Sequence, residues 1–591
     1  MAIDSTTGAA QPPAPYSVTE GALQALKDLI SACEYTLPVE FLRHVEYITF
    51  DASSPGSDMV HFPCPLREQD AMLAIKALEA CAAAAIVDLL CGDETPSENE
   101  DGRRIVIDVD KTSCFLMSAY LTTIDGLGKL DNGVKAKLQD TDINRAQSNL
   151  YRRLSANLYE TKNPGEYYHI HGSLEATKTL EMIGLPPFNS ALEKNYRASI
   201  NTIESAVKKF TSKELDEKNM EHRQAGIPAL TWDQFLNTPH GEVLSTMAPM
   251  SVEASELWTP PVPFSPSDNL SGPQYALRDI KVLELCRIIA GPTIGRSLAA
   301  HGATVLKVTS PDLPDVPFFQ VDVNTGKHAI KLDLKKESGR ETFERLLADA
   351  DVIIDGYRPG ALARLGYGKD KLLNLAACRS RGIVYVAEDC FGGTRGTGTT
   401  SEAGAEWAYR PGWQQIADCV TGVAWAQGKF MGIDEPVVPP FPMSDYGTGA
   451  LGCVAAMAGL YNRATKGGSW FCRTSLCQYD VFLMSLGLLP EDEQQRLRKV
   501  HNSEFFKLRH HDSVDMVGSH AVHSMRSAVP HLFDKALMHT ARSAGFNAVV
   551  AWPKEAIRVE GLRIGHVRAT RPNGFDDEHT WEGWGEDAIS E

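Results

Sequence analysis

Residues 277–390 alternate short apolar runs with longer amphipathic stretches. The apolar runs are rich in Val, Ile and Leu and lie at 280–285, 303–308, 352–355 and 382–387. An amphipathic stretch follows the first run, and another, 338–350, precedes the third. Short buried strands that alternate with helices are typical of a parallel sheet. The pattern therefore predicts an α/β protein with a Rossmann-like parallel sheet domain in this region.

The remaining sequence predicts further units around that domain. A Pro/Ser-rich stretch near the middle of the chain is typical of an extended linker. A smaller α+β module is expected within 120–250. The units we predict are a disordered leader at 1–17, a first part at 18–255, the linker at 256–274, the sheet domain at 275–485, and a shortened small domain with a returning chain at 486–591.

Two pairs of segments suggest that part of the chain is duplicated. Residues 112–118 (TSCFLMS) resemble 478–485 (QYDVFLMS), and each follows a β-like run. Residues 225–232 (AGIPALTW) resemble 544–552 (AGFNAVVAW) in the same order. A partial internal duplication would make 18–255 a degenerate copy that lacks the alternating pattern. The alternative is a chance likeness between amphipathic segments.

Composition excludes several classes of function. The chain of 591 residues is 43% hydrophobic and 23% charged, with a formal net charge of −18. Such an acidic chain is not expected to bind nucleic acid. Its 12 cysteines form no CxxC pattern, so no metal site is expected. With no signal-peptide pattern and no apolar stretch long enough to span a bilayer, we expect no membrane partner and a cytoplasmic location.

Several motifs occur in the order found in one known family. These are 277–285 (LRDIKVLEL) with Ala-Gly-Pro at 290–292, 298–308 (LAAHGATVLKV), 324–335 (NTGKHAIKLDLK), and 350–360 (ADVIIDGYRPG) with 364–368 (RLGYG). Together they resemble the class III CoA-transferases, which include formyl-CoA transferase, carnitine CoA-transferase and α-methylacyl-CoA racemase. The resemblance covers about 200 residues from 277 to 485 and is faint in the first half.

The resemblance implies acyl-CoA as a substrate, with no tightly bound cofactor. It makes Arg358 a contact for the CoA phosphates and places Lys307 near the adenosine end. Both follow or end predicted strands, where open α/β sheets bind ligands, and a guanidinium suits phosphate. Gly291 and Pro292 would allow close approach of the backbone. The alternatives are solvated surface cations and an ordinary turn.

The residue expected to carry the chemistry is Asp445, in the segment 442–449 (PMSDYGTG) before a long apolar helix. In the family, an Asp in this setting is the catalytic carboxylate. An Asp before a helix is also a good N-cap, which is the structural alternative. Gly392 and Gly393 begin a glycine-rich loop that could exclude water from hydrolysable intermediates, or could form only a surface loop.

These residues predict a CoA-transferase that moves CoA from an acyl-CoA donor to a carboxylic acid through an aspartyl-CoA thioester. Family racemases place a His upstream of the Asp, whereas this chain has Trp413 there, which cannot shuttle protons. A racemase, epimerase or related isomerisation or dehydration enzyme stays an alternative, as does a non-catalytic CoA-binding or scaffold protein. Glu68 and Asp70 stand near the matching place in the first half, without the glycines, so no second site is expected there. The family's interlocked dimers imply a homodimer or an intrachain pseudo-dimer.

Overall fold

The computed structural model describes residues 16–91, 102–265, 273–393, 407–576, 580–581 and 589. Most of the predicted leader, the middle of the predicted linker and most of the glycine-rich loop lie outside these residues. Ser17, at the end of the predicted leader, is the N-cap of the first helix.

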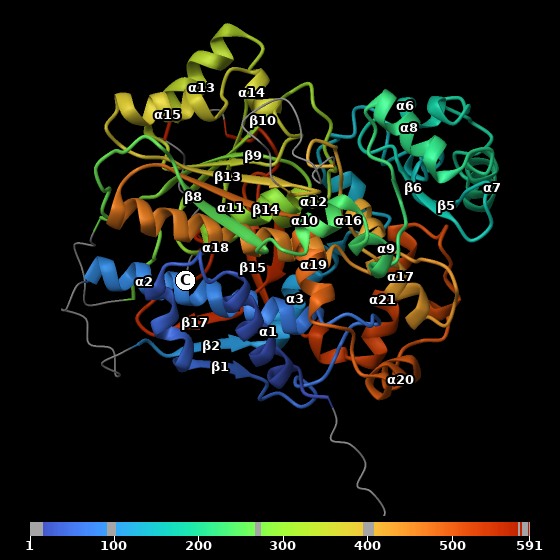
Figure 1. Ribbon diagram of the computed structural model, residues 1–591, viewed down its shortest axis with the longest axis horizontal. Helices are drawn as coiled ribbons and strands as arrows, with labels where there is room; N and C mark the ends of the chain where they lie inside the picture. Colours follow the sequence, from blue (N-terminus) through green and yellow to red (C-terminus); the bar gives the residue numbers. More distant parts are fainter. Residues whose placement is uncertain are drawn as a thin grey trace, which may run out of the picture.

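A seven-stranded sheet forms the centre of the molecule (Figure 1). Its strands, in spatial order, are β11 (His328–Lys331), β10 (Thr304–Thr309), β9 (Lys281–Leu285), β12 (Val352–Asp355), β13 (Val384–Asp389), β14 (Trp470–Ser475) and β8 (Met250–Ala254). The first six run parallel and β8 is antiparallel to β14. If the six strands from β9 to β14 are numbered 1 to 6 along the chain, their spatial order is 3-2-1-4-5-6, which is typical of doubly wound folds. The predicted parallel α/β sheet is confirmed.

Both faces of the sheet are covered by helices, because successive strand residues are apolar on both sides. Leu283 and Ile353 pack in a core with α13 (Glu337–Asp349) and α15 (Lys369–Cys378). Val282 and Val352 belong to the larger core, which includes α11 (Ala290–Ala300) and α18 (Met443–Lys466). Figure 1 shows these two helical layers above and below the strands. The other helices of this part are α12 (Phe319–Val323), α14 (Ala361–Arg364), α16 (Gln414–Val420), α17 (Val423–Phe430) and α19 (Leu476–Ser485).

The N-terminal part repeats a fragment of this arrangement below α18. Strand β1 (Ile48–Asp51) pairs parallel with β2 (Ile105–Asp108), and β17 (Ile557–Val559) pairs antiparallel with β2. The same parallel-then-antiparallel order occurs in β13, β14 and β8. Helix α2 (Glu68–Cys91) precedes β2 as α18 precedes β14, and the two helices pack together. This likeness agrees with the partial duplication, which stays a prediction.

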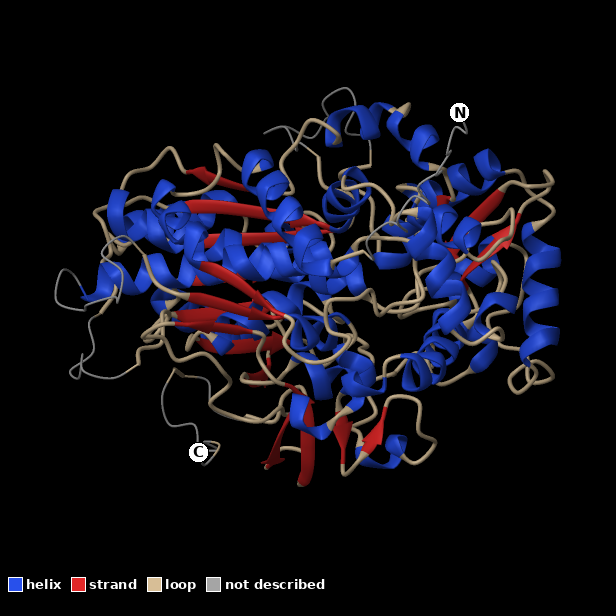
Figure 2. Ribbon diagram, turned by 90° about the horizontal axis from the view of Figure 1, so that it is seen from below, coloured by secondary structure: helices blue, strands red, loops and turns tan. Residues whose placement is uncertain are grey.

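The remaining elements of the N-terminal part connect it to the smaller units. They are α1 (Val18–Ala32), α3 (Val109–Leu116), α4 (Ser118–Leu121), β3 (Thr123–Ile124) and β4 (Leu127–Gly128). Strand β3 joins a second small sheet by pairing with β16 (Ala548–Pro553), which pairs with β15 (Met538–Ser543). Figure 2 shows these strands apart from the large sheet.

A small α+β domain lies beside the large sheet, as predicted within 120–250 (Figure 1). Its antiparallel strands are β5 (Ala156–Glu160), β6 (Tyr167–His171) and β7 (Ile227–Pro228). Its helices, with the two that follow it, are α5 (Leu150–Arg153), α6 (Thr177–Met182), α7 (Tyr196–Val207), α8 (Ser212–His222), α9 (Trp232–Leu236) and α10 (Pro239–Leu244).

Two strands pair with sheets outside the predicted units to which they belong. Strand β8 comes from the first part but completes the large sheet, whereas β17 comes from the last part and completes the N-terminal sheet. Helices α20 (Glu491–Val500) and α21 (Val514–Ala528) lie between β8 and β17 in the sequence. The domain boundaries stay predictions. Among the described residues, no helix is long and apolar enough to cross a bilayer.

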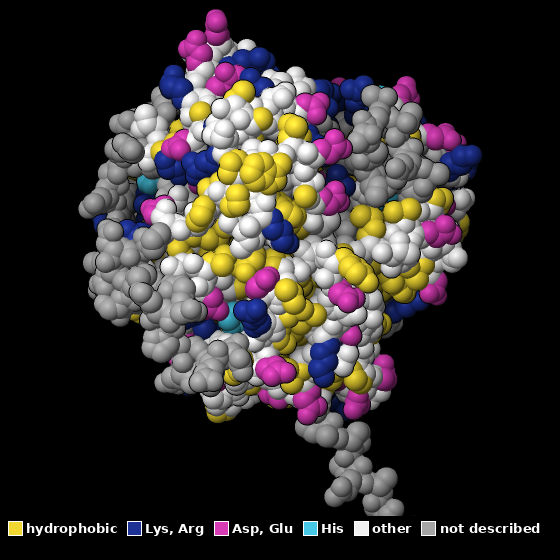
Figure 3. All heavy atoms as spheres, turned by 60° about the vertical axis from the view of Figure 1, so that its left-hand side comes forward, with side chains coloured by type: hydrophobic (Ala, Val, Ile, Leu, Met, Phe, Trp, Pro, Cys, Tyr) yellow, Lys and Arg dark blue, Asp and Glu magenta, His cyan; other side chains and the backbone are white. Residues whose placement is uncertain are grey.

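Surface charge is mixed rather than concentrated by sign on the face shown in Figure 3. Basic and acidic side chains of the described residues are interspersed there with small apolar areas.

Candidate active site

A cavity of about 540 Å³ lies at the carboxyl ends of β9 and β12. These neighbouring strands mark the point where the strand order reverses, which is where open α/β folds bind ligands. Arg287, Ile288 and Ile289 follow β9, and Tyr357 and Arg358 follow β12; all five line the cavity. The fold therefore places two loops from separate motifs on one binding surface.

Three arginines of this cavity have no carboxylate partner among the described residues. Arg287 donates to the carbonyl oxygen of Pro314 at 2.6 Å, Arg358 to that of Arg223 at 3.4 Å, and Arg364 to that of Pro359 at 3.4 Å. Burial, followed by repulsion from Arg287 and Arg364, lowers the pKa of Arg358. Mutually repelling guanidinium groups are costly unless a polyanion binds them, so this arginine cluster suits phosphate groups.

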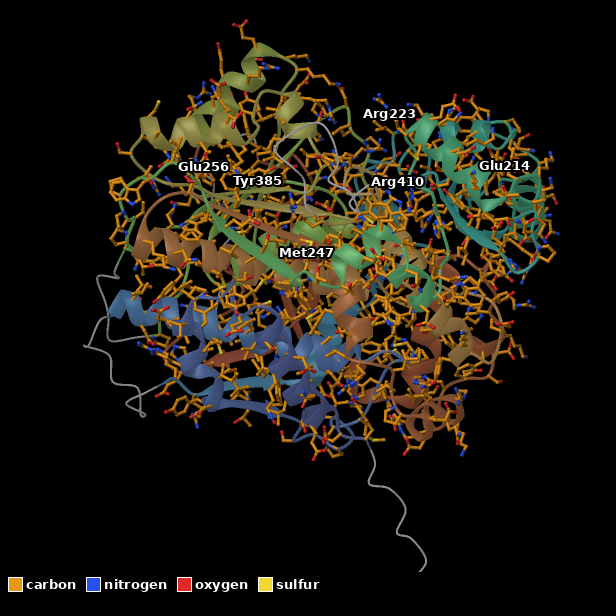
Figure 4. All side chains as sticks on the ribbon, in the orientation of Figure 1. Glu214, Arg223, Met247, Glu256, Tyr385 and Arg410 are labelled. Carbon is orange, nitrogen blue, oxygen red and sulfur yellow. The ribbon has the colours of Figure 1, made fainter. Side chains whose placement is uncertain are left out.

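A fourth arginine of the cavity, Arg410, is held by the small domain. Its two terminal nitrogens donate to both carboxylate oxygens of Asp216, at 2.9 and 2.8 Å. Figure 4 shows Arg410 and Arg223 between the small domain and the large sheet. The small domain therefore closes one side of the cavity through an ion pair and through the Arg223 carbonyl.

Asp445 lies in the first turn of α18 and lines this cavity. The N-cap position is occupied by Pro442, so the alternative that Asp445 caps the helix is wrong. Its backbone N–H donates to Oε1 of Gln414 at 3.4 Å. Asp445 also lines a smaller cavity of about 100 Å³, so its side chain stands where the two cavities meet.

The neighbours of Asp445 are carboxyl groups rather than cations. Burial, and then the charge of Asp480, raises the pKa of Asp445 to about 8. Burial likewise raises the pKa of Asp480 to about 7 and that of Glu68 to about 8. For Asp418 and Glu388, burial and nearby carboxylates raise the pKa well above the usual range. Carboxyl groups with strongly raised pKa values in a cavity are typical of catalytic sites.

We predict that any reaction that needs Asp445 as a carboxylate declines as the pH is lowered through about 8, the value to which burial raises the pKa of Asp445, because protonation removes the charge. Asp480→Asn removes the like charge and should move the midpoint of kcat/KM against pH to lower pH by about one unit, or about tenfold in rate on the acidic limb. The measurement is a pH series for both proteins. Glu341→Gln, on the exposed side of α13, is the control. An unshifted midpoint in Asp480→Asn would contradict the assignment.

The boundary between the two cavities consists of Ser173, Leu174, Ile288, Ile289 and Trp413, together with Asp445. Trp413 donates from Nε1 to Oγ of Ser173 at 2.7 Å and stacks on His171 with ring centroids 5.6 Å apart. Ile288 has φ 74°, a left-handed conformation that is strained for a β-branched residue. Such strain concentrates at functional sites, where the surrounding structure maintains it.

The structure places Lys307 away from this site. Its side chain is fully buried, and Nζ donates to Oδ1 of Asn324 at 2.9 Å and lies 4.0 Å from Oε1 of Glu284. Lys307 lines neither cavity, so the structure does not bring it together with Asp445. The position of a residue on a strand determines which face of the sheet its side chain lies on. It does not determine whether the side chain reaches the edge of the sheet where ligands bind.

The predicted glycines lie next to the cavity wall rather than on it. Gly291 and Pro292 are buried in the first turn of α11, one residue beyond Ala290, which does line the larger cavity. A Cβ on Gly291 would lie 2.8 Å from Cβ of Cys286, so glycine permits close packing of the helix on the β9 loop. The backbone at Gly291 therefore approaches another part of the protein, Cys286, and not a ligand.

Gly392 and Gly393 have positive φ values of 64° and 83° and are buried. The Gly392 N–H donates to Oδ1 of Asp389 at 2.7 Å, and Arg473 donates to the Gly393 carbonyl at 2.7 Å. They shape the turn after β13, while 394–406 lie outside the described residues. A role for the glycine-rich loop in excluding water stays a prediction.

Several residues of the site were not singled out from the sequence. Arg364 lies inside a quoted motif and Arg287 lies between two of them, and the rule that ligands bind at the ends of strands would have found Arg287. Ser173 and His171 come from the small domain, more than 200 positions from Asp445 in sequence. No local pattern indicates that these residues meet, because the contact depends on domain packing.

Comparison with known proteins shows to which family the chain belongs. The family model described as CoA-transferase family III matches residues 277–513. An acetyl-coenzyme A transferase, nodX of Hypoxylon pulicicidum, is 32% identical over 91% of this chain and 89% of its own length. The chain therefore belongs to CoA-transferase family III, and the predicted resemblance is confirmed.

A second relative and a solved structure are also similar to parts of this chain. An acyl-CoA transferase of Gibberella moniliformis is 30% identical over 72% of each chain. Among solved structures, a crystal structure of the hypothetical protein Rv3272 from Mycobacterium tuberculosis is 25% identical over 36% of this chain and 58% of that chain, with a TM-score of 0.30.

Proposed function

We propose that the protein transfers CoA from an acyl-CoA donor to a carboxylic acid through a covalent intermediate on Asp445. The observation that carries this proposal is the position of the Asp445 side chain, where an arginine-lined cavity meets a smaller, largely apolar one. A thioester whose CoA part lies against the arginine cluster would present its carbonyl carbon at that junction.

The proposed reaction has four steps. The Asp445 carboxylate attacks the thioester carbonyl, the C–S bond breaks, and a mixed anhydride forms with release of CoA thiolate. The thiolate attacks the aspartyl carbonyl, giving aspartyl-CoA and the donor's free carboxylate. The acceptor carboxylate attacks aspartyl-CoA and releases the thiolate, which then attacks the acceptor carbonyl of the new anhydride. Asp445 is regenerated and no net proton is consumed. Covalent catalysis replaces one difficult exchange with easier steps.

The walls of the junction suit intermediates that water would destroy. Ile288, Ile289, Leu174 and Trp413 surround Asp445 with apolar surface, and the Trp413–Ser173 hydrogen bond fixes the indole. Burial raises the pKa of Asp445, and the same loss of solvation makes its ionised form more reactive. We propose that this apolar boundary protects both the anhydride and the aspartyl thioester.

Racemisation or epimerisation has less support, because Asp445 is the only carboxyl or imidazole group among the described residues that line both cavities. Trp413 takes the place of the family's histidine. His171 is near, but its Nδ1 accepts from the Ser173 N–H at 3.0 Å and its Nε2 contacts Oε1 of Gln415 at 3.3 Å. Because an N–H can only donate, Nδ1 is the acceptor and Nε2 carries the proton. Both nitrogens are thus engaged away from a substrate α-carbon.

The proposal extends to the number of sites and to assembly. Glu68 and Asp70 lie in the first turn of α2, and Glu68 accepts from the Tyr479 hydroxyl at 2.7 Å within the core. We propose one active site per chain, with the first half supplying part of what a partner subunit gives in a dimeric relative. We also propose that the enzyme is cytoplasmic and that it uses CoA as a substrate and not as a bound cofactor.

The test is the intact mass of the protein after incubation with an acyl-CoA and hydroxylamine. Hydroxylamine converts an activated aspartyl carbonyl to a stable hydroxamate. We expect that modification on Asp445, mapped by peptide mass, and none in Asp445→Ala. Binding of CoA without any modification, across donors of different chain length, would favour the non-catalytic or racemase alternatives.

A further inference from the structure

A cluster of two histidines and one aspartate lies outside the two cavities, where three distant segments of the chain meet. His61 precedes α2, Asp110 lies in the first turn of α3, and His531 lies in the 3₁₀ helix η5 (Pro530–Phe533). Each side chain offers one ligand atom, and the three atoms lie within 4.8 Å of one another. None of the three residues lines either cavity beside Asp445, so the proposed reaction does not account for the cluster.

Two of these side chains face each other without a hydrogen bond. Oδ1 of Asp110 lies 3.4 Å from Nε2 of His531; both atoms are buried, and neither makes a hydrogen bond with any described residue. The other carboxylate oxygen, Oδ2 of Asp110, accepts from the Ser57 hydroxyl at 2.7 Å, which fixes the orientation of the carboxylate. Asp110 as a whole is only 6% exposed. Because a buried carboxylate oxygen without a donor is costly, a cation bound to Asp110 and His531 would stabilise both.

The surroundings of His61 allow its ring to carry the proton on Nδ1. Nδ1 lies 3.0 Å from Oγ of Ser113, whose own proton is donated to the Val109 carbonyl at 3.0 Å, so Oγ can accept from the ring. Nε2 of Gln69 also lies 3.0 Å from Nδ1, but it reaches two other acceptors, Oγ of Ser113 at 3.2 Å and the Met59 carbonyl at 3.3 Å. The Gln69 amide therefore stays satisfied when Nδ1 is protonated. A histidine that binds a metal ion through one nitrogen donates from the other in this way.

In that tautomer, Nε2 of His61 is an acceptor that faces the Gly56 carbonyl oxygen at 3.2 Å. Gly56 lies beside His531, since a Cβ on Gly56 would be 3.8 Å from Cε1 of His531, and the next residue, Ser57, donates to Asp110. Nε2 of His61 therefore points toward the cluster. Without an ion, the proton can move to Nε2 and be donated to the carbonyl, whereas two facing acceptors are stable only with a cation between them. Binding of a cation thus selects the tautomer that is protonated on Nδ1.

The separations between the facing atoms suit zinc. Zinc binds imidazole nitrogen and carboxylate oxygen at about 2.0–2.2 Å in a tetrahedron, whose ligand atoms are then about 3.3–3.6 Å apart. Oδ1 of Asp110 and Nε2 of His531 are 3.4 Å apart, and Nε2 of His61 is 3.2 Å from the Gly56 carbonyl oxygen. Two imidazoles and one carboxylate are ligands that zinc and similar divalent ions prefer, and the Gly56 carbonyl oxygen or a water molecule can take the fourth position.

A second group of similar spacing, Glu204, His510 and His511, is already satisfied. Nε2 of His510 bonds to Glu204 at 2.8 Å and its Nδ1 bonds to Glu435 at 2.9 Å, so both ring nitrogens donate to carboxylates. Nε2 of His511 accepts from Arg197 at 2.7 Å. A nitrogen that donates a proton cannot bind a metal ion, and a guanidinium group repels one. Of these two clusters, only the first therefore suits a cation.

We propose that His61, Asp110 and His531 bind a zinc ion, or a divalent transition-metal ion of the same class, that links the N-terminal part of the chain to its C-terminal part. The ion has a structural role, because its ligands come from three separate segments and lie outside both cavities. The His531 side chain is 29% exposed, so the ion can enter from solvent. Cysteine spacing predicts no metal site, but it carries no information on ligands that come from distant segments.

Zinc content and affinity test the site directly. The full chain without a tag, stripped with a chelator, exposed to Zn²⁺ and passed through gel filtration, should retain one zinc per chain by plasma mass spectrometry. Calorimetric titration with Zn²⁺ should give an affinity at least about 100-fold weaker in His531→Gln, because losing even a group that only orients a ligand costs about 10–100-fold. Ser113→Ala, which removes the acceptor for Nδ1 of His61, should weaken binding by about 10-fold. His523→Gln, on the exposed side of α21, is the control.

Co²⁺ in place of zinc reports on the ligands themselves. We expect wild type to show the visible d–d bands of four-coordinate Co²⁺ and no thiolate charge-transfer band, because none of the ligands is a cysteine. His531→Gln and Asp110→Asn should lose these bands while circular dichroism shows that both variants are folded. A wild-type chain that retains no zinc, an unchanged affinity in His531→Gln, or a thiolate band would each overturn the proposal. His531 and Asp110 would then form an ordinary ion pair.

Discussion

Asp445→Asn is expected to lower CoA transfer by about 10⁴-fold or more while making the folded protein more stable at alkaline pH. The amide cannot form the anhydride or the aspartyl thioester, so the covalent route is lost. It also carries no charge, so the fold no longer has to hold a carboxylate among Asp480, Asp418 and Glu388.

The sign of the stability effect follows from the pKa of Asp445. Burial, and then the Asp480 charge, raise that pKa to about 8 in the folded chain, above the usual value near 4. The folded state therefore binds the proton more tightly, and stability from this group is present below pH 4 and is lost as pH rises towards 8. At pH 8.5 the Asn variant should exceed wild type by about 1–3 kcal/mol, and at pH 4 the difference should vanish.

Thermal unfolding at both pH values, without CoA, measures this difference. Glu341→Gln, a change of the same kind on the surface of α13, should not alter the dependence on pH. An Asn variant that is less stable than wild type at pH 8.5 would show that Asp445 has a structural partner and is not held at a cost to stability.

Replacing the arginine cluster is expected to have the second largest effect, on CoA binding. Arg358→Gln should weaken binding by about 10–100-fold, because a charge-assisted hydrogen bond contributes about 1.5–3 kcal/mol. The triple change of Arg287, Arg358 and Arg364 to Gln should lose more than any single change. Removing mutual repulsion should also leave the apo protein at least as stable, since repulsion from Arg287 and Arg364 contributes to lowering the pKa of Arg358.

Calorimetric titration with CoA and with 3′-dephospho-CoA assigns the phosphates. A variant that binds both forms equally has lost its contact with the 3′-phosphate, whereas one that still discriminates has lost a pyrophosphate contact. Arg345→Gln, on α13 and outside the cavities, is the matched control. Undiminished binding by the triple variant would contradict the assignment of the larger cavity to CoA.

Much of the sheet domain could be predicted because its signals are local. Strands β9, β10, β12 and β13 coincide with apolar runs, and α11 and α13 with amphipathic ones. A strand buried on both faces needs consecutive apolar residues, and that need is written directly in the sequence. Arg358 and Asp445 could be found because each lies in a motif with a defined place on this sheet.

Lys307 shows where that reasoning fails. It lies on β10 among family-like residues, yet its ammonium is buried with Asn324 and Glu284. The sequence shows a cation on a strand, but whether it faces a ligand or an internal carboxylate depends on the side chains that neighbouring strands place beside it.

The sequence alone indicated the enzyme family, the parallel α/β sheet and the carboxylate expected to react, because each depends on contiguous motifs. Only the tertiary structure decided which cations face the cavity and what the acyl group meets. The walls around Asp445 combine Arg287 of the sheet domain, Ser173 and Arg153 of the small domain, and Asp515 of the C-terminal part. Hydrophobic burial brings these segments together, and it depends on the whole chain and not on any one motif.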